Sequence, residues 1–181
     1  RGEKLVVRSM KNSQNLPGDI YNRLNLYAFT GAAALLAAEQ ERDKSDSGQA
    51  AALGAAVVQP DAKVKAEWLA HITDPQTKLP FSKIRRAMEN MYPAEQGALG
   101  ELSASQRLAQ LGQVDKAAGP VFMRSYANMM IPAGCTPASV QRLQAAVGKL
   151  KDLSAGTRRA LLVTHQEDER CVAIKKAMTA N

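Results

Sequence analysis

Histidine, cysteine and carboxylate side chains are the groups that could catalyse a reaction or hold a metal ion here. The two histidines are His71 and His165. A zinc hydrolase motif of the form H-E-x-x-H places two histidines four positions apart on one helix face, with the glutamate as general base. Ile72 follows His71 and Gln166 follows His165, where that motif requires glutamate. The sequence therefore predicts no zinc site and no catalytic residue in this segment.

His165 and Asp168 lie three positions apart on the last helix that the sequence predicts. Such a pair could act as a general base with its orienting carboxylate. The sequence gives no serine, threonine or cysteine a reason to lie beside it as a nucleophile. We therefore favour for these residues a buried or interfacial polar contact that fixes the register of the helix.

Cys135 and Cys171 are the two cysteines of the chain. Two cysteines form neither a metal site nor a disulfide-dense scaffold. The favoured interpretation is two free, buried thiols. The alternative is one disulfide between them, if the parent protein is exported.

The net charge is +7, and the basic residues are unevenly spread. Lys78, Lys83, Arg85 and Arg86 follow one another with no acid between them. Solvated helix faces are the simplest interpretation. The sharper interpretation is a basic lining for an anion, either a peptide carboxylate or a phosphate backbone. The aromatics and glycine-rich loops of nucleic-acid binders are missing, so we expect no nucleic-acid partner.

The composition predicts an all-α chain that forms a single domain over residues 1–181. Hydrophobic residues make up 45% of the sequence and aromatic residues only 4%, so Ala, Leu, Val and Met must do the packing, which suits close helix–helix contacts. The best strand-like run, at residues 4–7, is short. No apolar run approaches the roughly 20 residues of a membrane span.

Apolar spacing and turn residues predict seven or eight helices or more, of which Val64, Trp68 and Ile72 mark one buried face. The predicted helices run from Asp19 to about Asp43, between Asp46 and Pro60, before Pro75, between Pro80 and Pro93, after Ser103, between Pro120 and Pro132, after Thr136 and after Ser154. Short connections favour antiparallel hairpins. We predict a right-handed stack of such hairpins, an irregular HEAT-like superhelix, with a compact bundle as the alternative.

The cap and turn segments between these helices form a series with a characteristic order and spacing. They are residues 38–43 (AEQERD), 45–49 (SDSGQ), 60–65 (PDAKVK), 72–75 (ITDP), 79–80 (LP), 93–96 (PAEQ), 121–122 (VF), 128–132 (NMMIP), 135–137 (CTP), 153–154 (LS), 158–162 (RRALL) and 166–170 (QEDER). Over roughly residues 35–178 the series resembles the C-terminal helical domain of bacterial zinc aminopeptidases of the aminopeptidase N (gluzincin) family. No single segment is diagnostic of catalysis.

The resemblance implies that this chain is a C-terminal fragment of a larger enzyme whose catalytic domain is absent. The parent would remove N-terminal residues from peptides with a zinc ion held in another domain, so this segment needs no cofactor and should be inactive alone. The family's G-x-M-E-N segment, which anchors the substrate's amino group, has a partial match at residues 87–90. Arg86 replaces its leading position and the context is helical, so we interpret this match as coincidence.

In the family, such a domain encloses the active-site cavity and limits or positions the peptide. The partners implied are the catalytic domains of the same polypeptide and the peptide substrate. The candidate peptide contacts are Lys83, Arg85, Arg86, Arg124, Arg158 and Arg159, because arginine can bind a carboxylate with two hydrogen bonds. The alternative is a stand-alone helical-repeat adaptor that binds another protein. The compartment, periplasmic or cytoplasmic, stays open.

Overall fold

The computed structural model describes residues 16–179, and within them every regular element is a helix, as the composition predicts. The strand-like run at residues 4–7 lies outside this range. Ten α-helices and one 3-10 helix follow one another: α1 (Leu16–Leu26), α2 (Ala32–Arg42), α3 (Asp46–Val57), α4 (Ala62–Thr73), α5 (Phe81–Met91), η1 (Ala94–Gln96), α6 (Gly97–Leu102), α7 (Ala104–Ala117), α8 (Pro120–Met130), α9 (Pro137–Lys149) and α10 (Ala155–Thr179). No helix in this part of the chain is both long and apolar enough to cross a membrane.

The helix starts predicted at Pro120 and Thr136 are confirmed, and Asp61 caps a further helix. The Asp61 carboxylate accepts hydrogen bonds from the backbone N–H groups of Lys63 and Val64 at the start of α4. Pro120 occupies the first turn of α8. Thr136 and Ser139 form a reciprocal capping box at the start of α9. These local bonds satisfy N–H groups that have no partner within the helix.

The long helix predicted from Asp19 to Asp43 is wrong, because the chain breaks between α1 and α2. Ala28 has a φ of 49° and Gly31 a φ of 91°, so both lie in the left-handed region that ends a right-handed helix. The cap of α3 is Ser45, whose hydroxyl accepts from the Gly48 N–H, not Asp46. Ser103 makes no side-chain cap; its hydroxyl donates to the Tyr92 hydroxyl at 2.9 Å instead.

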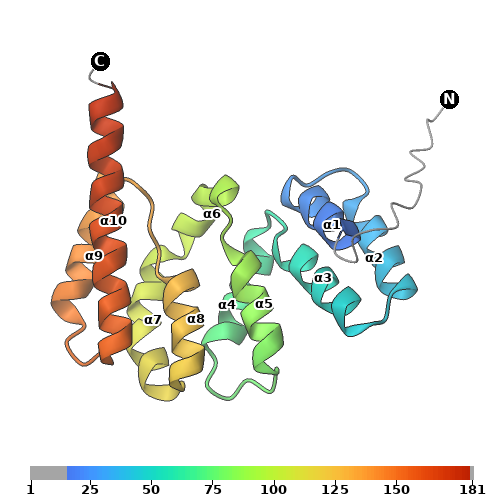
Figure 1. Ribbon diagram of the computed structural model, residues 1–181, viewed down its shortest axis with the longest axis horizontal. Coiled ribbons are helices and arrows are strands. Elements are labelled where there is room, and N and C mark those ends of the chain that lie inside the picture. The colour runs from blue at the N-terminus through green and yellow to red at the C-terminus, as the bar shows by residue number, and fades with distance from the viewer. Residues whose placement is uncertain (1–15, 180–181) are drawn as a thin grey trace.

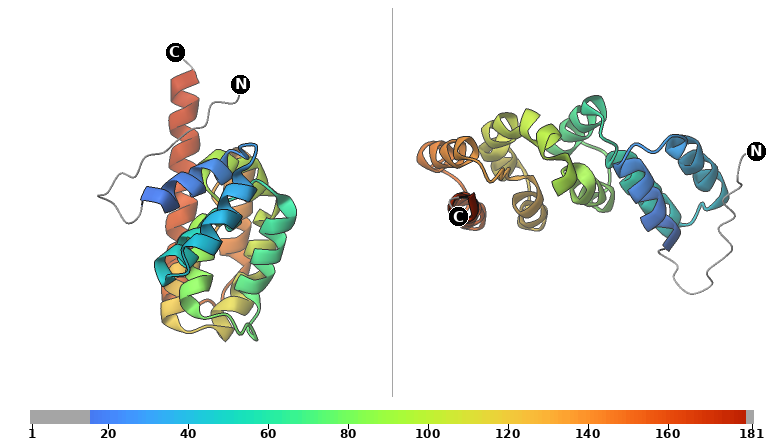
Figure 2. Two further views of the ribbon diagram at one scale, coloured as in Figure 1. Left: turned by 90° about the vertical axis from the view of Figure 1, so that its right-hand side faces the viewer. Right: turned by 90° about the horizontal axis from the view of Figure 1, so that it is seen from above.

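The helices form two layers of antiparallel hairpins arranged in a row (Figure 1). Helices α3, α5, α8 and α10 pack side by side in one layer, which we call the front layer, while α4, α7 and α9 lie behind them. Figure 2 shows both layers from above, and the row is arched rather than straight. All four front-layer helices run in the same direction, each with its N-terminus at the lower edge in Figure 1. This arrangement is a helical stack; its predicted right hand stays a prediction.

A continuous apolar core runs between the two layers from α3 to α10. Its fully buried members include Leu69, Ile84, Met91, Met130 and Leu143, contributed by both layers. Leu, Ile and Met fill this core with few aromatic rings, as the composition predicts. Trp68 packs against the core from its edge, so its predicted packing role is confirmed.

Cys135 and Cys171 form a disulfide, so the preference for two free thiols is wrong. The segment between α8 and α9 crosses over α10 and brings the two Cα atoms to 5.3 Å from one another, a separation typical of disulfides. Cys135 has a φ of 51°, in the left-handed region. Its partner on α10 is only half-buried, so the bond lies close to solvent.

Candidate functional site

The six basic residues proposed as peptide contacts all lie on the front layer. Three of them, Lys83, Arg85 and Arg86, belong to α5. Arg124 lies on α8, and Arg158 and Arg159 lie on α10. Because α5, α8 and α10 are neighbours that run in the same direction, side chains far apart in the sequence occur on one layer.

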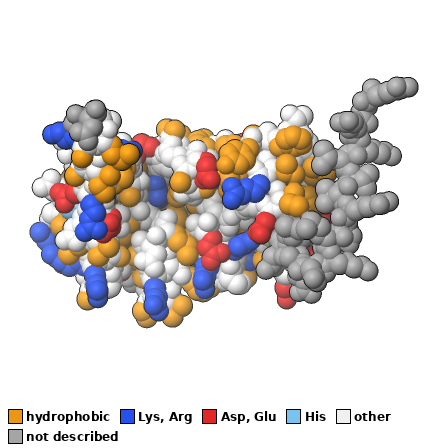
Figure 3. Space-filling model, turned by 45° about the horizontal axis from the view of Figure 1, so that its top comes forward, with side chains coloured by type: hydrophobic (Ala, Val, Ile, Leu, Met, Phe, Trp, Pro, Cys, Tyr) orange, Lys and Arg blue, Asp and Glu red, His pale blue; other side chains and the backbone are white. Residues whose placement is uncertain are grey.

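Three of these arginines lie near the starts of neighbouring front-layer helices. Arg85, Arg124 and Arg159 are each the fifth residue of their helix, and all three side chains are exposed. We call these three residues the arginine row. The helical period puts each of them away from the buried side of its helix. In Figure 3, Lys and Arg side chains recur along the lower edge of the molecule from α10 towards α5.

The positive charge of the arginine row is weakly compensated. The first turns of α5, α8 and α10 contain no acidic residue. Arg85 pairs with Glu89 on its own helix, with Nε 3.1 Å from Oε1. Within residues 16–179, no carboxylate oxygen lies within 4.0 Å of a nitrogen of Arg124 or Arg159. The N-terminal ends of the three helices add partial positive charge at the same edge.

Lys83 and Arg86 are separated from the row because they face α3. The Arg86 Nε donates to the backbone carbonyl of Ala50 at 3.1 Å. Arg86 also lines a hollow of about 390 Å³ between α1, α2, α3 and α5, together with Tyr21 and Glu39. Lys83 lines a second hollow, of about 320 Å³, on the far side of α3. Of the six proposed peptide contacts, Lys83 and Arg86 therefore lie apart from the arginine row.

The hollow beside Arg86 contains a carboxylate that is already paired. Glu39 accepts hydrogen bonds from Arg42 and, at 3.2 Å, from the Tyr21 hydroxyl. The hydrogen bond from Arg42 is the main cause that lowers the pKa of Glu39, against the effect of burial. Burial, followed by the charge of Glu39, raises the pKa of Tyr21. This cluster ties α1 to α2.

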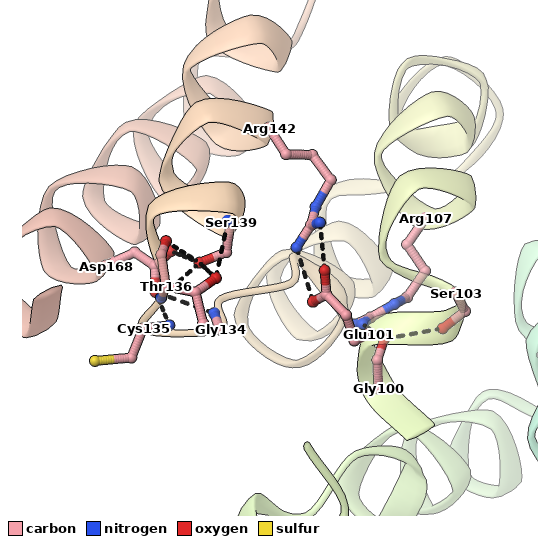
Figure 4. A network of polar contacts seen from close by, with 10 residues as sticks. All are labelled: Gly100, Glu101, Ser103, Arg107, Gly134, Cys135, Thr136, Ser139, Arg142 and Asp168. Atoms are coloured by element: carbon pink, nitrogen blue, oxygen red, sulfur yellow. Dashed lines mark hydrogen bonds and ion pairs between the residues drawn. The ribbon is translucent and has the colours of Figure 1, made fainter. Parts of the chain in front are cut away.

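Asp168 forms a buried polar contact between α10 and the start of α9, of the kind that the sequence predicts. Its side chain is 2% exposed and accepts hydrogen bonds from the backbone N–H groups of Gly134, at 3.0 Å, and Cys135, at 2.6 Å. The Ser139 hydroxyl donates to its other oxygen at 2.5 Å. Figure 4 shows these donors converging on Asp168 from the segment before α9 and from the first turn of α9.

His165 is not among the residues that bind Asp168. His165 Nε2 instead lies 3.7 Å from a carboxylate oxygen of Glu169. Asp168 serves as an anchor for the neighbouring backbone, one turn before the disulfide at Cys171. The sequence shows Cys171 three residues after Asp168. This spacing does not reveal which backbone N–H groups the Asp168 carboxylate binds.

A buried arginine next to this cluster also has a structural role. Arg107 is 4% exposed, and its guanidinium donates to the carbonyl oxygens of Met130, at 2.9 Å, and Gly100, at 2.7 Å. The guanidinium carbon lies 3.9 Å from the centre of the Tyr92 ring, a cation–π geometry. Burial is the main cause that lowers the pKa of Arg107. Both carbonyls lie at ends of helices, so Arg107 joins α6 and α8 through α7.

The remaining candidate groups are engaged in packing or covalent bonds. His71 lies edge-on to Trp68, with ring centres 5.7 Å apart, and both cysteines are in the disulfide. In the described part of the chain, no three His, Cys, Asp or Glu side chains are grouped as they would be around a metal ion. No protein-family model matches this chain, and no curated protein matches it significantly.

Proposed function

We propose that this chain is the C-terminal accessory domain of a zinc aminopeptidase, which encloses the active-site cavity and positions the peptide. The ordered series of cap and turn segments supports this proposal, because it resembles that family over roughly residues 35–178. The observation that carries the peptide-binding part is the arginine row, which places three exposed guanidinium groups on one layer of a helical stack.

The contribution of this domain to catalysis would be binding at a distance from the reacting bond. Arginine can hold a carboxylate through two parallel hydrogen bonds, so the row would bind acidic groups of a long peptide. Binding energy from such remote contacts orients the substrate at the catalytic centre. The zinc chemistry would belong to other domains of the polypeptide, and a peptide too short to reach the row would gain nothing from it.

The test of this proposal uses the full-length polypeptide. Replacing Arg85, Arg124 and Arg159 together by glutamine should raise KM for long acidic peptides and leave dipeptide-sized substrates nearly unchanged. The matched control replaces three exposed lysines of the back layer by glutamine. They are Lys63 on α4, Lys116 on α7 and Lys149 on α9. Equal effects on short and long substrates would contradict the proposed role of the row.

The isolated chain provides a second test. We expect no hydrolysis of alanyl or leucyl anilides and no bound zinc when the metal content of the same sample is measured. Hydrolysis with one zinc ion per chain would mean that this segment carries the chemistry itself, which would refute its role as an accessory domain.

The alternative, a stand-alone helical-repeat adaptor, is favoured by a different surface. Tyr27 and Phe29 are 62% and 57% exposed, and they line a hollow of about 400 Å³ with Ile20 and Leu24. Exposed apolar surface of this kind marks contact sites in many proteins. The coding sequence upstream separates the two functions, because only an aminopeptidase requires an H-E-x-x-H motif there.

A further inference from the structure

We infer that the arginine row binds an extended acidic peptide segment whose carboxylates recur at every third residue. This inference deepens the peptide contact of the proposed function, since it names the chemical class and the spacing that the site selects. It concerns Arg85, Arg124 and Arg159 only. The other basic candidates on α5, Lys83 and Arg86, face α3 and lie outside it.

The spacing follows from the packing of the helices that carry the row. Helices in contact lie about 8–10 Å apart, and α8 packs against both α5 and α10. Each arginine is the fifth residue of its helix, and the three helices begin at the same lower edge of the layer in Figure 1, so the row crosses the layer near that edge. A peptide in the polyproline II conformation has three residues per turn and rises about 3.1 Å per residue. Side chains on one side of it therefore recur about every 9 Å, which matches the helix spacing.

The charge of the row indicates an acidic ligand. Several other arginines pair with carboxylates of the chain, as in Arg142 with Glu101, whose second hydrogen bond is 2.9 Å long, and Arg170 with Glu167 at 3.1 Å, whereas exposed Arg23 and Arg158 form no such pair within residues 16–179. Among the described residues, Arg124 and Arg159 have no such partner, and the first turns of α5, α8 and α10 contain no acid. A carboxylate supplied by another chain would complete these pairs.

A peptide fits this surface better than a nucleic acid does. Proteins that bind single-stranded nucleic acid stack the bases on exposed aromatic rings. The aromatic rings of α5 and α8, Phe81, Phe122 and Tyr126, pack in sequence against one another, with ring centres 5.8 Å and 6.0 Å apart. Exposed Val121 on α8 and Leu162 on α10 are aliphatic and suit the proline rings or aliphatic side chains of a peptide.

The experiment compares two peptides of the same composition with the isolated chain. One is Glu-Pro-Pro-Glu-Pro-Pro-Glu, with the acids spaced by three, and the other is Pro-Pro-Glu-Glu-Glu-Pro-Pro, with the acids adjacent. Binding is followed by NMR at low salt through the arginine Nε–H signals and the backbone amides of α5, α8 and α10. We expect the spaced peptide to bind at least about five-fold more tightly, because only it engages all three arginines.

Two sets of variants locate the binding site. Replacing the three arginines of the row by glutamine should weaken binding of the spaced peptide by about ten-fold or more. The control with Lys63, Lys116 and Lys149 replaced by glutamine removes the same charge from the back layer, and it should retain affinity within about two-fold. The helical circular dichroism spectrum of each variant verifies that it is folded. All six substituted side chains are exposed, so we expect folding to be preserved.

Three outcomes would overturn the inference: equal affinity for the two peptides, equal loss in the two variants, or no binding of the spaced peptide at low salt. Tighter binding of a single-stranded oligonucleotide than of the spaced peptide would also overturn it, in favour of a phosphate ligand. If the spaced peptide fails while the row variant still raises KM for long substrates in the full-length polypeptide, only this inference fails. The proposed function would then stand.

Discussion

Lys65 is a buried cation whose effect on stability can be calculated from the structure. It is 4% exposed and its Nζ donates to the backbone carbonyl of Val57 at 2.7 Å. Within residues 16–179 no carboxylate forms an ion pair with it. Burial lowers the pKa of Lys65 from 10.5 to about 8. At neutral pH the folded state therefore carries the cost of a buried charge.

The pKa difference sets the sign and the size of the effect. The unfolded chain binds this proton more tightly than the folded chain, so stability rises as the pH increases from about 8 to about 10.5. The penalty is fully present below pH 8 and disappears above pH 10.5. At 1.36 kcal/mol for each pKa unit, its upper limit is about 3 kcal/mol. Solvent screening and local relaxation keep the actual value below this limit.

Replacing Lys65 by methionine should stabilise the protein at pH 7. The substitution removes the buried charge and also the hydrogen bond to Val57, which is worth about 1 kcal/mol. We therefore expect a net gain of about 1–2 kcal/mol, or a rise in Tm of about 3–6 °C for a chain of this size. Urea unfolding between pH 7 and 10.5, followed by circular dichroism, measures the difference between the native protein and the variant.

The pH dependence of the stability difference between the native protein and Lys65→Met tests the buried-charge argument. It should shrink as the pH rises above 8, because the native protein loses the penalty and the variant never had it. Comparing the two proteins cancels the titration of other groups, such as Tyr126, whose pKa burial raises to about 12. Replacing Lys63, which is exposed on the same helix, by methionine is the control. Parallel pH profiles for native protein and Lys65→Met would refute the buried-charge argument.

Three further predictions concern the anchors of the stack. Asp168→Asn should lower the free energy of unfolding by about 2 kcal/mol in urea titrations, because the amide nitrogen cannot accept from the Ser139 hydroxyl. Reducing the disulfide, which closes a separation of 36 residues, should cost about 3–4 kcal/mol and speed proteolysis of residues 169–179. Arg107→Lys should destabilise the protein by about 2 kcal/mol in thermal unfolding, because one ammonium cannot reproduce two diverging hydrogen bonds.

Each of these predictions has a control. Glu169→Gln, one residue after Asp168 and exposed, should change stability by less than about 0.5 kcal/mol. Cys135→Ser with Cys171→Ser should make the protein insensitive to reductant; continued sensitivity would show that the disulfide is not the cause. For Arg107, unchanged stability in the lysine variant would mean that the two carbonyls find other donors.

The fold class and most helix boundaries could be predicted because their signals are local. Each of these signals affects the helical turn that directly follows it in the sequence, as at Asp61, Pro120 and Thr136. The break between α1 and α2 could not be predicted in the same way. The apolar spacing of α1 continues into α2 without a proline, and the left-handed conformation of Ala28 is not a property of alanine itself.

The candidate site was only partly predictable because side-chain partners depend on packing. The sequence identified the basic residues but not their faces, so Arg85 and Arg86 were grouped although only Arg86 also bonds to α3; both pair with Glu89. It also could not place residues 134 and 135 over Asp168, which the fold brings together from about 30 positions away. The three arginines share one layer because α5, α8 and α10 pack side by side.

The anchoring of α10 determines which parts of the front layer are fixed. The start of the helix is attached to α7, since the Asp115 carboxylate accepts hydrogen bonds from Ser154 and, at 2.5 Å, from Thr157. Burial acts to raise the pKa of Asp115, but these hydrogen bonds outweigh it and lower the pKa. Arg159 lies two residues after Thr157 and is held by this first anchor. Asp168 and the disulfide hold the helix more than two turns further along, so loss of either should leave the geometry of the arginine row intact.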